Sequence, residues 1–251
     1  MRLQGKVAIV TGGGAGFGEG IARRFAAEGA KVVVNDIDGQ QGERVARAIA
    51  DDGGEAAFIN ANVASGADVA KLVGGAVERF GRLDIMVNNA GVPQRNGPMT
   101  EVSEEAFDRI YAVNVKSIYW AAVHAVPVFR RQGGGVFINT SSTAALRPRP
   151  GLVWYNGSKG AVNTITKSMA VELAPDKIRV NAVCPVAGDT QMLADFMGGD
   201  TPEKRAAFRA TVPLGRFSQP LDIANAALFL ASNEAEFLTG VCLEVDGGRC
   251  I

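Results

Sequence analysis

The sequence predicts an α/β fold in which one doubly wound parallel sheet of about seven strands is flanked by helices. Short β-branched runs alternate with longer helical patterns from one end of the chain to the other. Most of these runs are solid apolar blocks, which is typical of parallel strands covered on both faces. No linker rich in proline, glycine or serine divides the 251 residues, so we expect a single domain over residues 1–251.

The elements follow in a regular order. The expected strands cover residues 7–10, 31–35, 56–59, 84–87, 136–139, 178–183 and 241–245, and the expected helices include residues 18–28, 40–51, 68–80, 103–131 and 154–173. Residues 189–211 break this rhythm, with a Gly-Gly-Asp sequence and no clear strand. An insertion of this length is more often functional than structural, and we expect it to form a lid over the substrate.

Composition excludes several classes of protein. Lys plus Arg equals Asp plus Glu at 26 each, so the chain lacks the basic footprint of a nucleic-acid binder. Its single histidine, His124, rules out any metal site with two histidine ligands from one chain, and we expect no metal. No uncharged apolar run approaches 18 residues, and the first residues do not resemble a signal peptide. We therefore expect a cytoplasmic protein that binds neither nucleic acid nor membrane.

The first strand runs into the glycine-rich sequence TGGGAGFG at residues 11–18, which precedes a helical stretch. Glycine allows a turn with positive φ and a close approach of the backbone to a ligand. The helix that begins there directs its N-terminal amides and the positive end of its dipole at the turn, where a pyrophosphate fits. At the first strand–helix junction, this pattern predicts dinucleotide binding and a Rossmann-type fold.

Asp36 at the end of the second strand indicates which dinucleotide binds. A carboxylate about 20 residues beyond the glycine loop can accept both ribose hydroxyls of an adenosine and repels a 2′-phosphate. No basic residue adjoins it to offset that charge, because Ala15 precedes Gly16 and Ile37 follows Asp36. The sequence therefore favours NAD over NADP, with a solvated strand-end aspartate as the alternative interpretation.

Further motifs carry the chemistry. Asn-Asn-Ala-Gly occupies residues 88–91, Ser142 follows the fifth expected strand, and Tyr155 and Lys159 are separated by four positions in an expected helix. Residues i and i+4 share a helix face, so a cationic Lys159 would lower the pKa of Tyr155 from its usual value near 10. A tyrosine with a lowered pKa is a usable acid or base near neutral pH. Alone, such a pair is common on protein surfaces.

Taken together, these motifs resemble the short-chain dehydrogenase/reductase family. The resemblance covers essentially the whole chain: TGGGAGFG, the NNAG motif, Asn114 in NVKS, Ser142 thirteen residues before Tyr155, YNGSK, RVNAVCP and a C-terminal segment from Pro213 to Gly248. It implies that Tyr155 exchanges a proton with the substrate oxygen and that Ser142 hydrogen-bonds the same oxygen. It also implies that Lys159 binds the nicotinamide ribose and that Asn114 holds a water of a proton relay.

The resemblance also implies the cofactor contacts. They comprise Thr11, Gly12, Gly16, Phe17 and Gly18 of the loop, Asp36 and Ile37 at the ribose, Asn62 and Val63 around the adenine, Asn89, Ala90 and Gly91 along the ribose, and Pro185, Val186 and Thr190 beside the nicotinamide, in addition to Tyr155 and Lys159. Two positions depart from the family, which often has Asp-Val at 62–63 and Pro-Gly at 185–186. Val186 would narrow the space for the substrate.

The expected activity is hydride transfer between NAD and a secondary alcohol, polyol, sugar or other hydroxy compound, in the oxidative direction or its reverse. The alternatives are a ketoreductase resembling 3-oxoacyl-carrier-protein reductases and a catalytically idle dinucleotide sensor. A Rossmann-type methyltransferase is disfavoured by the Tyr155–Lys159 pair. The loop at 93–96 is an expected pocket wall, and Arg95, Arg147 or Arg149 could meet an anionic substrate, although solvated arginines are the simpler interpretation.

The two helices at 103–131 and 154–173 carry more apolar residues than one sheet-facing stripe requires. Such a surplus predicts an interface, and the resemblance implies a homotetramer that pairs through these helices. The residues concerned are Ile118, Tyr119, Trp120, Val123 and Val126 on the first helix, and Val162, Ile165, Met169 and Val171 on the second. The alternative is a monomer in which the lid and neighbouring loops cover them.

Overall fold

The computed structural model describes residues 1–190 and 192–251 and confirms the predicted parallel sheet. Seven strands lie in the order β3-β2-β1-β4-β5-β6-β7, and every pairing is parallel. The strand order reverses between β1 and β4, which is the point where an open α/β sheet forms a binding crevice. The strands are β1 Val7–Thr11, β2 Lys31–Asp36, β3 Glu55–Asn60, β4 Ile85–Asn88, β5 Gly135–Thr140, β6 Ile178–Pro185 and β7 Cys242–Val245.

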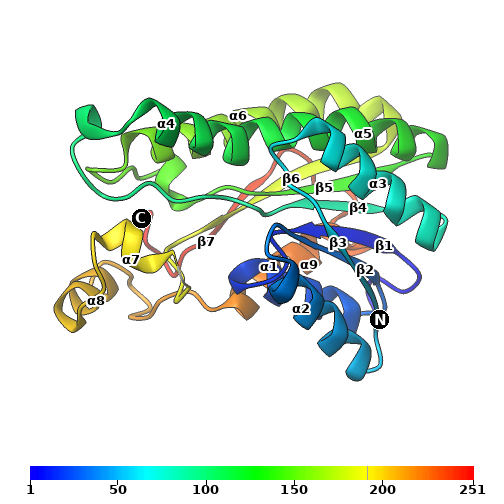
Figure 1. The fold of residues 1–251 in the computed structure, drawn as a ribbon, viewed down its shortest axis with the longest axis horizontal. Helices are drawn as coiled ribbons and strands as arrows, with labels where there is room; N and C mark the ends of the chain where they lie inside the picture. Colours follow the sequence, from blue (N-terminus) through cyan, green and yellow to red (C-terminus); the bar gives the residue numbers. More distant parts are fainter. Residues whose placement is uncertain (191) are drawn as a thin grey trace.

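Helices cover both faces of the sheet (Figure 1). One face carries α1 (Gly16–Ala27), α2 (Gly39–Asp51) and α9 (Pro220–Ala231), and the other carries α3 (Gly66–Phe80), α5 (Ser117–Gln132) and α6 (Val153–Leu173). The predicted helix bounds agree with α1, α2, α3 and α6 to within two residues. Helix α9 is not among the helices expected from the sequence.

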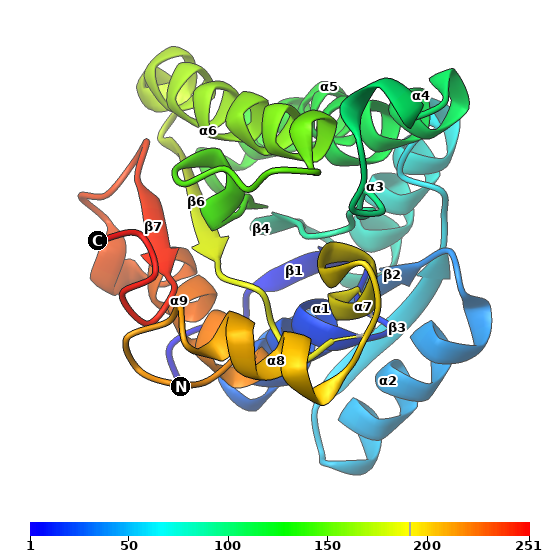
Figure 2. The ribbon, with the colours of Figure 1, turned by 90° about the vertical axis from the view of Figure 1, so that its left-hand side faces the viewer.

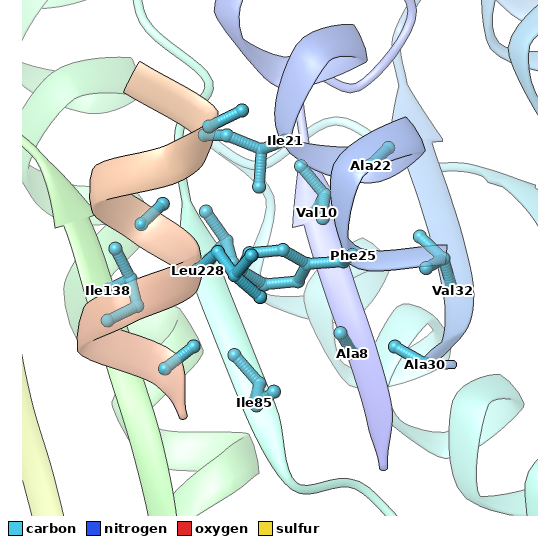
Figure 3. Close-up of a cluster of buried hydrophobic side chains, with 14 of the residues drawn as sticks. Ala8, Val10, Ile21, Ala22, Phe25, Ala30, Val32, Ile85, Ile138 and Leu228 are labelled. Carbon is cyan, nitrogen blue, oxygen red and sulfur yellow. The ribbon is translucent and has the colours of Figure 1, made fainter. Parts of the chain in front are cut away.

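The alternation of side chains along the central strands explains why both faces need a cover. Ala8 and Val10 of β1 face the α1 and α9 side, whereas Ile9 between them faces the α3 and α5 side. Phe25 of α1 and Leu228 of α9 meet over the strands (Figure 3), and both are fully buried. Two apolar layers therefore fix the sheet, and its carboxyl edge stays free for function.

The prediction of one continuous α-helix at 103–131 is wrong, because the hydrogen-bond pattern changes within this stretch. It is built from α4 (Glu104–Tyr111), a π-helical turn η2 (Ala112–Lys116) and α5. A π-turn inserts an extra residue into a helix and occurs often at functional sites. Here it contains Asn114, one of the predicted catalytic residues.

The segment at 189–211 contains two short helices, α7 (Leu193–Met197) and α8 (Pro202–Arg209). Figure 2 shows both helices in front of the sheet, and Figure 1 shows them at its left-hand end. Leu193 and Phe208 of this segment pack in a small apolar cluster with residues on either side of it. The cluster comprises Val186, Leu193, Phe208, Val212 and Phe217. Among residues 1–190 and 192–251, no helix has both the length and the apolar character that crossing a membrane requires.

Candidate active site

A cavity of about 860 Å³ lies along the carboxyl ends of strands β1 to β6. This volume is within the usual range for small-molecule and cofactor sites. The cavity is lined by every residue predicted for catalysis or cofactor binding except Thr11 and Asn114, namely Gly12, Gly16, Phe17, Gly18, Asp36, Ile37, Asn62, Val63, Asn89, Ala90, Gly91, Ser142, Tyr155, Lys159, Pro185, Val186 and Thr190. The predicted residues thus meet in one place.

The glycine loop between β1 and α1 has the geometry that a phosphate group needs. Gly12 and Gly16 adopt φ values of 60° and 53°, in the left-handed region that favours glycine. A Cβ atom at Gly18 would collide with the carbonyl oxygen of Gly12, so no larger residue fits there. Ala15 precedes α1 and has no side chain able to cap the first amides. These amides can therefore bind an anion, and the residues present fit a dinucleotide.

Asp36, the last residue of β2, lines the same cavity, as expected. Its carboxylate accepts hydrogen bonds from the backbone N–H of Gly14 at 2.9 Å and of Asp38 at 3.0 Å. Two acceptor oxygens offer about four lone-pair positions, so capacity for ribose hydroxyls remains. Ile37 beside it is 71% exposed, and it lines the cavity rim.

One basic residue near Asp36 carries no signal in the sequence. Arg44 of α2 lines the cavity, donates to the Gly14 carbonyl oxygen at 3.0 Å and forms an ion pair with Glu19 at 2.7 Å. The Arg44 guanidinium holds the pKa of the Glu19 carboxyl below its usual range. Because Glu19 engages this cation, the local charge still disfavours a 2′-phosphate.

Thr11, another predicted cofactor contact, lies next to the cavity without lining it. It is 2% exposed and lies outside the lining, beneath the loop. Its hydroxyl donates to the Val87 carbonyl oxygen and accepts from the backbone N–H of Asn89 and of Ala90, both at 3.0 Å. These bonds occupy the hydroxyl, so Thr11 ties the glycine loop to the NNAG motif, and its contact with the cofactor stays a prediction.

Tyr155 and Lys159 both line the cavity from the first turns of α6. Their exposed fractions are 9% and 4%. The Lys159 ammonium donates to the Thr140 carbonyl oxygen at 2.8 Å and lies 5.7 Å from the centroid of the Tyr155 ring. The spacing of four residues thus gives the shared face that the sequence predicts.

The expected lowering of the Tyr155 pKa is not what the structure shows. Burial raises the pKa of the Tyr155 phenol to about 12, and the Ser142 hydroxyl opposes this with a smaller effect. Burial also lowers the pKa of the Lys159 ammonium, to about 8. Residue spacing contains no measure of desolvation, which is the largest cause of the shift in the Tyr155 pKa.

Ser142 and Asn114 hold the backbone around these two residues. The Ser142 hydroxyl accepts from the backbone N–H of Ala144 at 3.1 Å, at the start of the short helix η3 (Thr143–Ala145). Asn114 is buried beside the cavity, where its side chain accepts from the Val92 N–H at 2.8 Å and donates to the Val92 carbonyl oxygen. Asn114 therefore fixes the loop after the NNAG motif, and its role in a proton relay stays a prediction.

Gln94 belongs to the predicted pocket wall at 93–96, but it does not line the cavity. It is buried, and its side-chain oxygen accepts from the backbone N–H of Trp154 and of Tyr155, both at 3.0 Å. Leu152 at the N-cap of α6 has no capping side chain, so Gln94 caps this helix from 60 residues away. It thereby positions the backbone of Tyr155.

Replacing Gln94 by methionine tests this positioning. The substitution keeps the length of the side chain and removes the acceptor, so two buried amides lose their partner. We expect the free energy of unfolding to fall by about 1–2 kcal/mol. Denaturant unfolding measures it, and the exposed Gln40→Met on α2 is the control. Equal stability of the two variants would show that Gln94 has no capping role.

The structure places the three candidate arginines differently relative to the cavity. Arg95 is exposed and lies outside the cavity lining, which agrees with the simpler interpretation of a solvated arginine. Arg147 and Arg149 do line the cavity. Arg249, near the C-terminus, joins them, and no local pattern in the sequence marks it.

The departure at Val186 also has a structural role. Val186 is 3% exposed, packs against Leu193 and Phe208 of the segment at 189–211 and lines the cavity. Met192, Phe196 and Phe208 of this segment line the same cavity. The β-branched side chain at 186 thus joins the end of β6 to the segment at 189–211.

Comparisons with known proteins agree with this geometry. A family model described as enoyl-(acyl carrier protein) reductase matches residues 12–249. The chain is 50% identical to 4-formylbenzenesulfonate dehydrogenase of Comamonas testosteroni, over 100% of both chains. The solved structure of 3-ketoacyl-(acyl-carrier-protein) reductase from Brucella melitensis, complexed with NADH, has a TM-score of 0.93 at 47% identity, covering 99% of this chain and 100% of that one.

A second solved structure is 7α-hydroxysteroid dehydrogenase complexed with NADH and 7-oxo-glycochenodeoxycholic acid. It has a TM-score of 0.92 at 37% identity and covers 98% of this chain and 95% of that chain. The fold, the order of the motifs and these relatives agree. The chain belongs to the short-chain dehydrogenase/reductase family.

Proposed function

We propose that this protein is an NAD-dependent oxidoreductase that interconverts an alcohol and the corresponding carbonyl compound. The observation that carries the proposal is the joint lining of one cavity by the glycine loop, Asp36, Ser142, Tyr155 and Lys159. An idle sensor that only bound the dinucleotide would need the loop and Asp36, but not a buried tyrosine and lysine with a partly buried serine in the same cavity.

Each residue of the proposed active site has a separate role in the reaction. A bound nicotinamide supplies or accepts the hydride. Tyr155 gives a proton to the carbonyl oxygen during reduction and takes it back from the alcohol during oxidation. Ser142 donates a hydrogen bond to the same oxygen, and the charge of Lys159 stabilises the phenolate that Tyr155 becomes. Asn114 holds the backbone of Val92, beside the cavity, by accepting a hydrogen bond from its N–H.

NAD is the proposed cofactor, because Asp36 repels a 2′-phosphate and Glu19 engages Arg44. Both solved relatives are NADH complexes, which supports this choice. We also propose one catalytic domain over the whole chain, with residues 189–211 closing over the substrate. A cytoplasmic location is proposed as well, since the cysteines are free thiols, which suits a reducing compartment.

A screen of alcohols tests the function. Formation of NADH should be measured at 340 nm across secondary and benzylic alcohols, polyols and sugars, with NAD and NADP in parallel. We expect turnover of at least one alcohol and a preference for NAD. A ketoreductase of the 3-oxoacyl type, which the Brucella relative suggests, would instead oxidise NADPH or NADH with a 3-oxoacyl thioester. Binding of NAD without turnover of any substrate would favour the sensor.

The pKa values predict a pH dependence of carbonyl reduction. Lys159, with a pKa of about 8, loses its charge as pH rises through that value, whereas Tyr155, with a pKa of about 12, keeps its proton throughout this range. The phenolate then loses its stabilising cation, so kcat/KM for reduction should decline above pH 8. Initial-rate assays from pH 6 to 10 measure kcat/KM for reduction at each pH. Lys159→Met should be slow at every pH and show no such decline, and a decline retained in that variant would assign the titration to another group.

A homotetramer is the proposed assembly, but the structure corrects the residues involved. Ile118, Val126 and Val162 are buried within the chain itself and leave no surplus. Tyr119, Val123 and Val171 are 56%, 42% and 80% exposed on α5 and α6, so an apolar surface does remain. We propose that a second copy of the chain covers it.

Light scattering at micromolar concentration tests the assembly. We expect a mass near four times 26.2 kDa, and Val123→Glu should reduce it because a charge in an apolar interface is costly. The control is Leu221→Glu, which places the same charge at a 58% exposed apolar position on α9. A mass near 26.2 kDa for the unmodified chain would contradict the proposal.

A further inference from the structure

Three arginines line the same cavity as Tyr155. Arg147 and Arg149 lie between η3 and α6, and Arg249 lies in the turn that follows β7. Arg147 donates to the Arg249 carbonyl oxygen at 2.6 Å, which joins segments 102 residues apart. Buried Asp246 accepts from the backbone N–H of Gly248 and of Cys250, so the turn that carries Arg249 has a defined shape.

Asp246, the acidic residue in the turn of Arg249, directs its carboxylate at the backbone N–H groups of Gly248 and Cys250. No carboxylate among residues 1–190 and 192–251 forms an ion pair with any of the three guanidinium groups. Asp189, the acidic residue of the lining closest in sequence to the lid helices, is already paired with Arg205 at 3.0 Å. Burial, and to a smaller extent the charge of Arg249, lower the pKa of Arg149. Like charges held this close favour an anion between them.

Arg249 gives the sharpest sign of a missing partner. Its Nη1 atom is buried and has no hydrogen-bond acceptor among the described residues. A buried donor without a partner is unfavourable, and native proteins leave few of them. The lining of a cavity is a place where a ligand oxygen can satisfy such a donor.

Aromatic side chains that line the cavity contact both Tyr155 and Arg149. The ring centroid of Phe196 lies 4.9 Å from that of Tyr155, and the Arg149 guanidinium lies 4.7 Å from the ring centroid of Phe208. Both phenylalanines belong to residues 189–211, the proposed lid, and Leu152 lines the same cavity. The walls therefore suit an apolar frame with a polar group at each end.

We propose that Arg147, Arg149 and Arg249 bind an anionic group of the substrate, a carboxylate or a sulfonate, and so hold the reacting alcohol or carbonyl at Tyr155. This inference rests on the proposed function and names the substrate class for it. The substrate is an alcohol or aldehyde on an aromatic or alicyclic frame, with the anion at the opposite end. Planar guanidinium groups match the two or three oxygens of such anions.

A matched pair of probes tests the inference. Reduction of 4-formylbenzoate is compared with reduction of its methyl ester, which keeps the frame and removes the charge. We expect kcat/KM of the unmodified enzyme to favour the acid by at least about tenfold, mainly through KM. Arg149→Met and Arg249→Met should each lower kcat/KM for the acid by roughly tenfold to a hundredfold and leave the ester unchanged, as expected for a lost charge-assisted hydrogen bond.

Two controls separate binding from damage to the fold. Arg95→Met removes an exposed arginine outside the cavity and should change neither probe. Arg149→Lys keeps the charge without the planar fork and should retain part of the preference for the acid. Equal losses for acid and ester in Arg149→Met would overturn the proposal, as would equal efficiencies of the two probes in the unmodified enzyme.

Binding measurements keep this inference apart from the proposed function. Isothermal titration of the NAD-loaded protein with each probe reports affinity whether or not turnover occurs. Tighter binding of the acid that depends on Arg149, with no turnover of either probe when NADH is supplied and none of any alcohol when NAD is supplied, would support the anion site and contradict the proposed function. Turnover of both probes with no preference for the acid in binding would support the function and contradict the anion site.

Discussion

Replacing Tyr155 by phenylalanine is expected to lower kcat by at least about 10²-fold to 10⁴-fold, the range for a lost general acid or base. The substitution removes the buried hydroxyl and retains the ring, together with its contact to Phe196 at 4.9 Å. The affinity for NADH should change little, because the glycine loop, Asp36 and Lys159 are untouched. Initial rates give kcat, and the fluorescence of bound NADH gives the dissociation constant.

A second tyrosine in the chain supplies the control. Tyr119 is 56% exposed on α5, so Tyr119→Phe removes a phenol that lies outside the cavity lining. Its turnover should remain within about twofold of the unmodified enzyme, since the substitution removes a single oxygen atom outside the cavity. Near-normal turnover in Tyr155→Phe would remove the tyrosine from the mechanism.

The double substitution of Asp36 by alanine and Ile37 by arginine should raise the ratio of NADP to NAD efficiency by orders of magnitude. Asp36 repels a 2′-phosphate, and an arginine at the exposed position 37 can pair with one. The change is measured as kcat/KM for the two cofactors at a fixed saturating alcohol concentration.

Asp36 also accepts two backbone hydrogen bonds, so its loss could disturb the loop itself. Ile37→Arg alone keeps those bonds and should raise the ratio by a smaller factor. Glu19→Gln is a further comparison, because it releases Arg44 from its ion pair beside the same ribose site. A preference for NADP in the unmodified enzyme would contradict the interpretation of Asp36.

Much of the fold could be predicted because each central strand is buried on both faces and therefore forms an uninterrupted apolar run. The limits lie where tertiary contacts decide the backbone. The π-turn at Asn114 looks like ordinary helix in the sequence, and the side-chain hydrogen bonds to Val92 that accompany it come from 22 residues away. Helix α9 is almost wholly apolar, so it lacks the two-sided pattern that marks a surface helix.

The candidate site shows the same division. Residues in ordered motifs, such as Tyr155 and Lys159, could be found by spacing, and they line the cavity as expected. Gln94, Arg44 and Arg249 could not, because each acts on a segment distant in sequence and no motif surrounds it. The predicted direction of the Tyr155 pKa shift is wrong for a related reason: burial depends on the whole fold, whereas the spacing to Lys159 is local.

The transfer of deuterium tests hydride transfer to the dinucleotide most directly. An alcohol found in the screen is prepared with deuterium on the carbinol carbon and incubated with NAD, and the recovered dinucleotide is examined by mass spectrometry and NMR. We expect one deuterium atom at C4 of the nicotinamide for each molecule of carbonyl product, with transfer greatly slowed in Tyr155→Phe. Carbonyl product that forms while the dinucleotide stays unlabelled would contradict the proposed reaction.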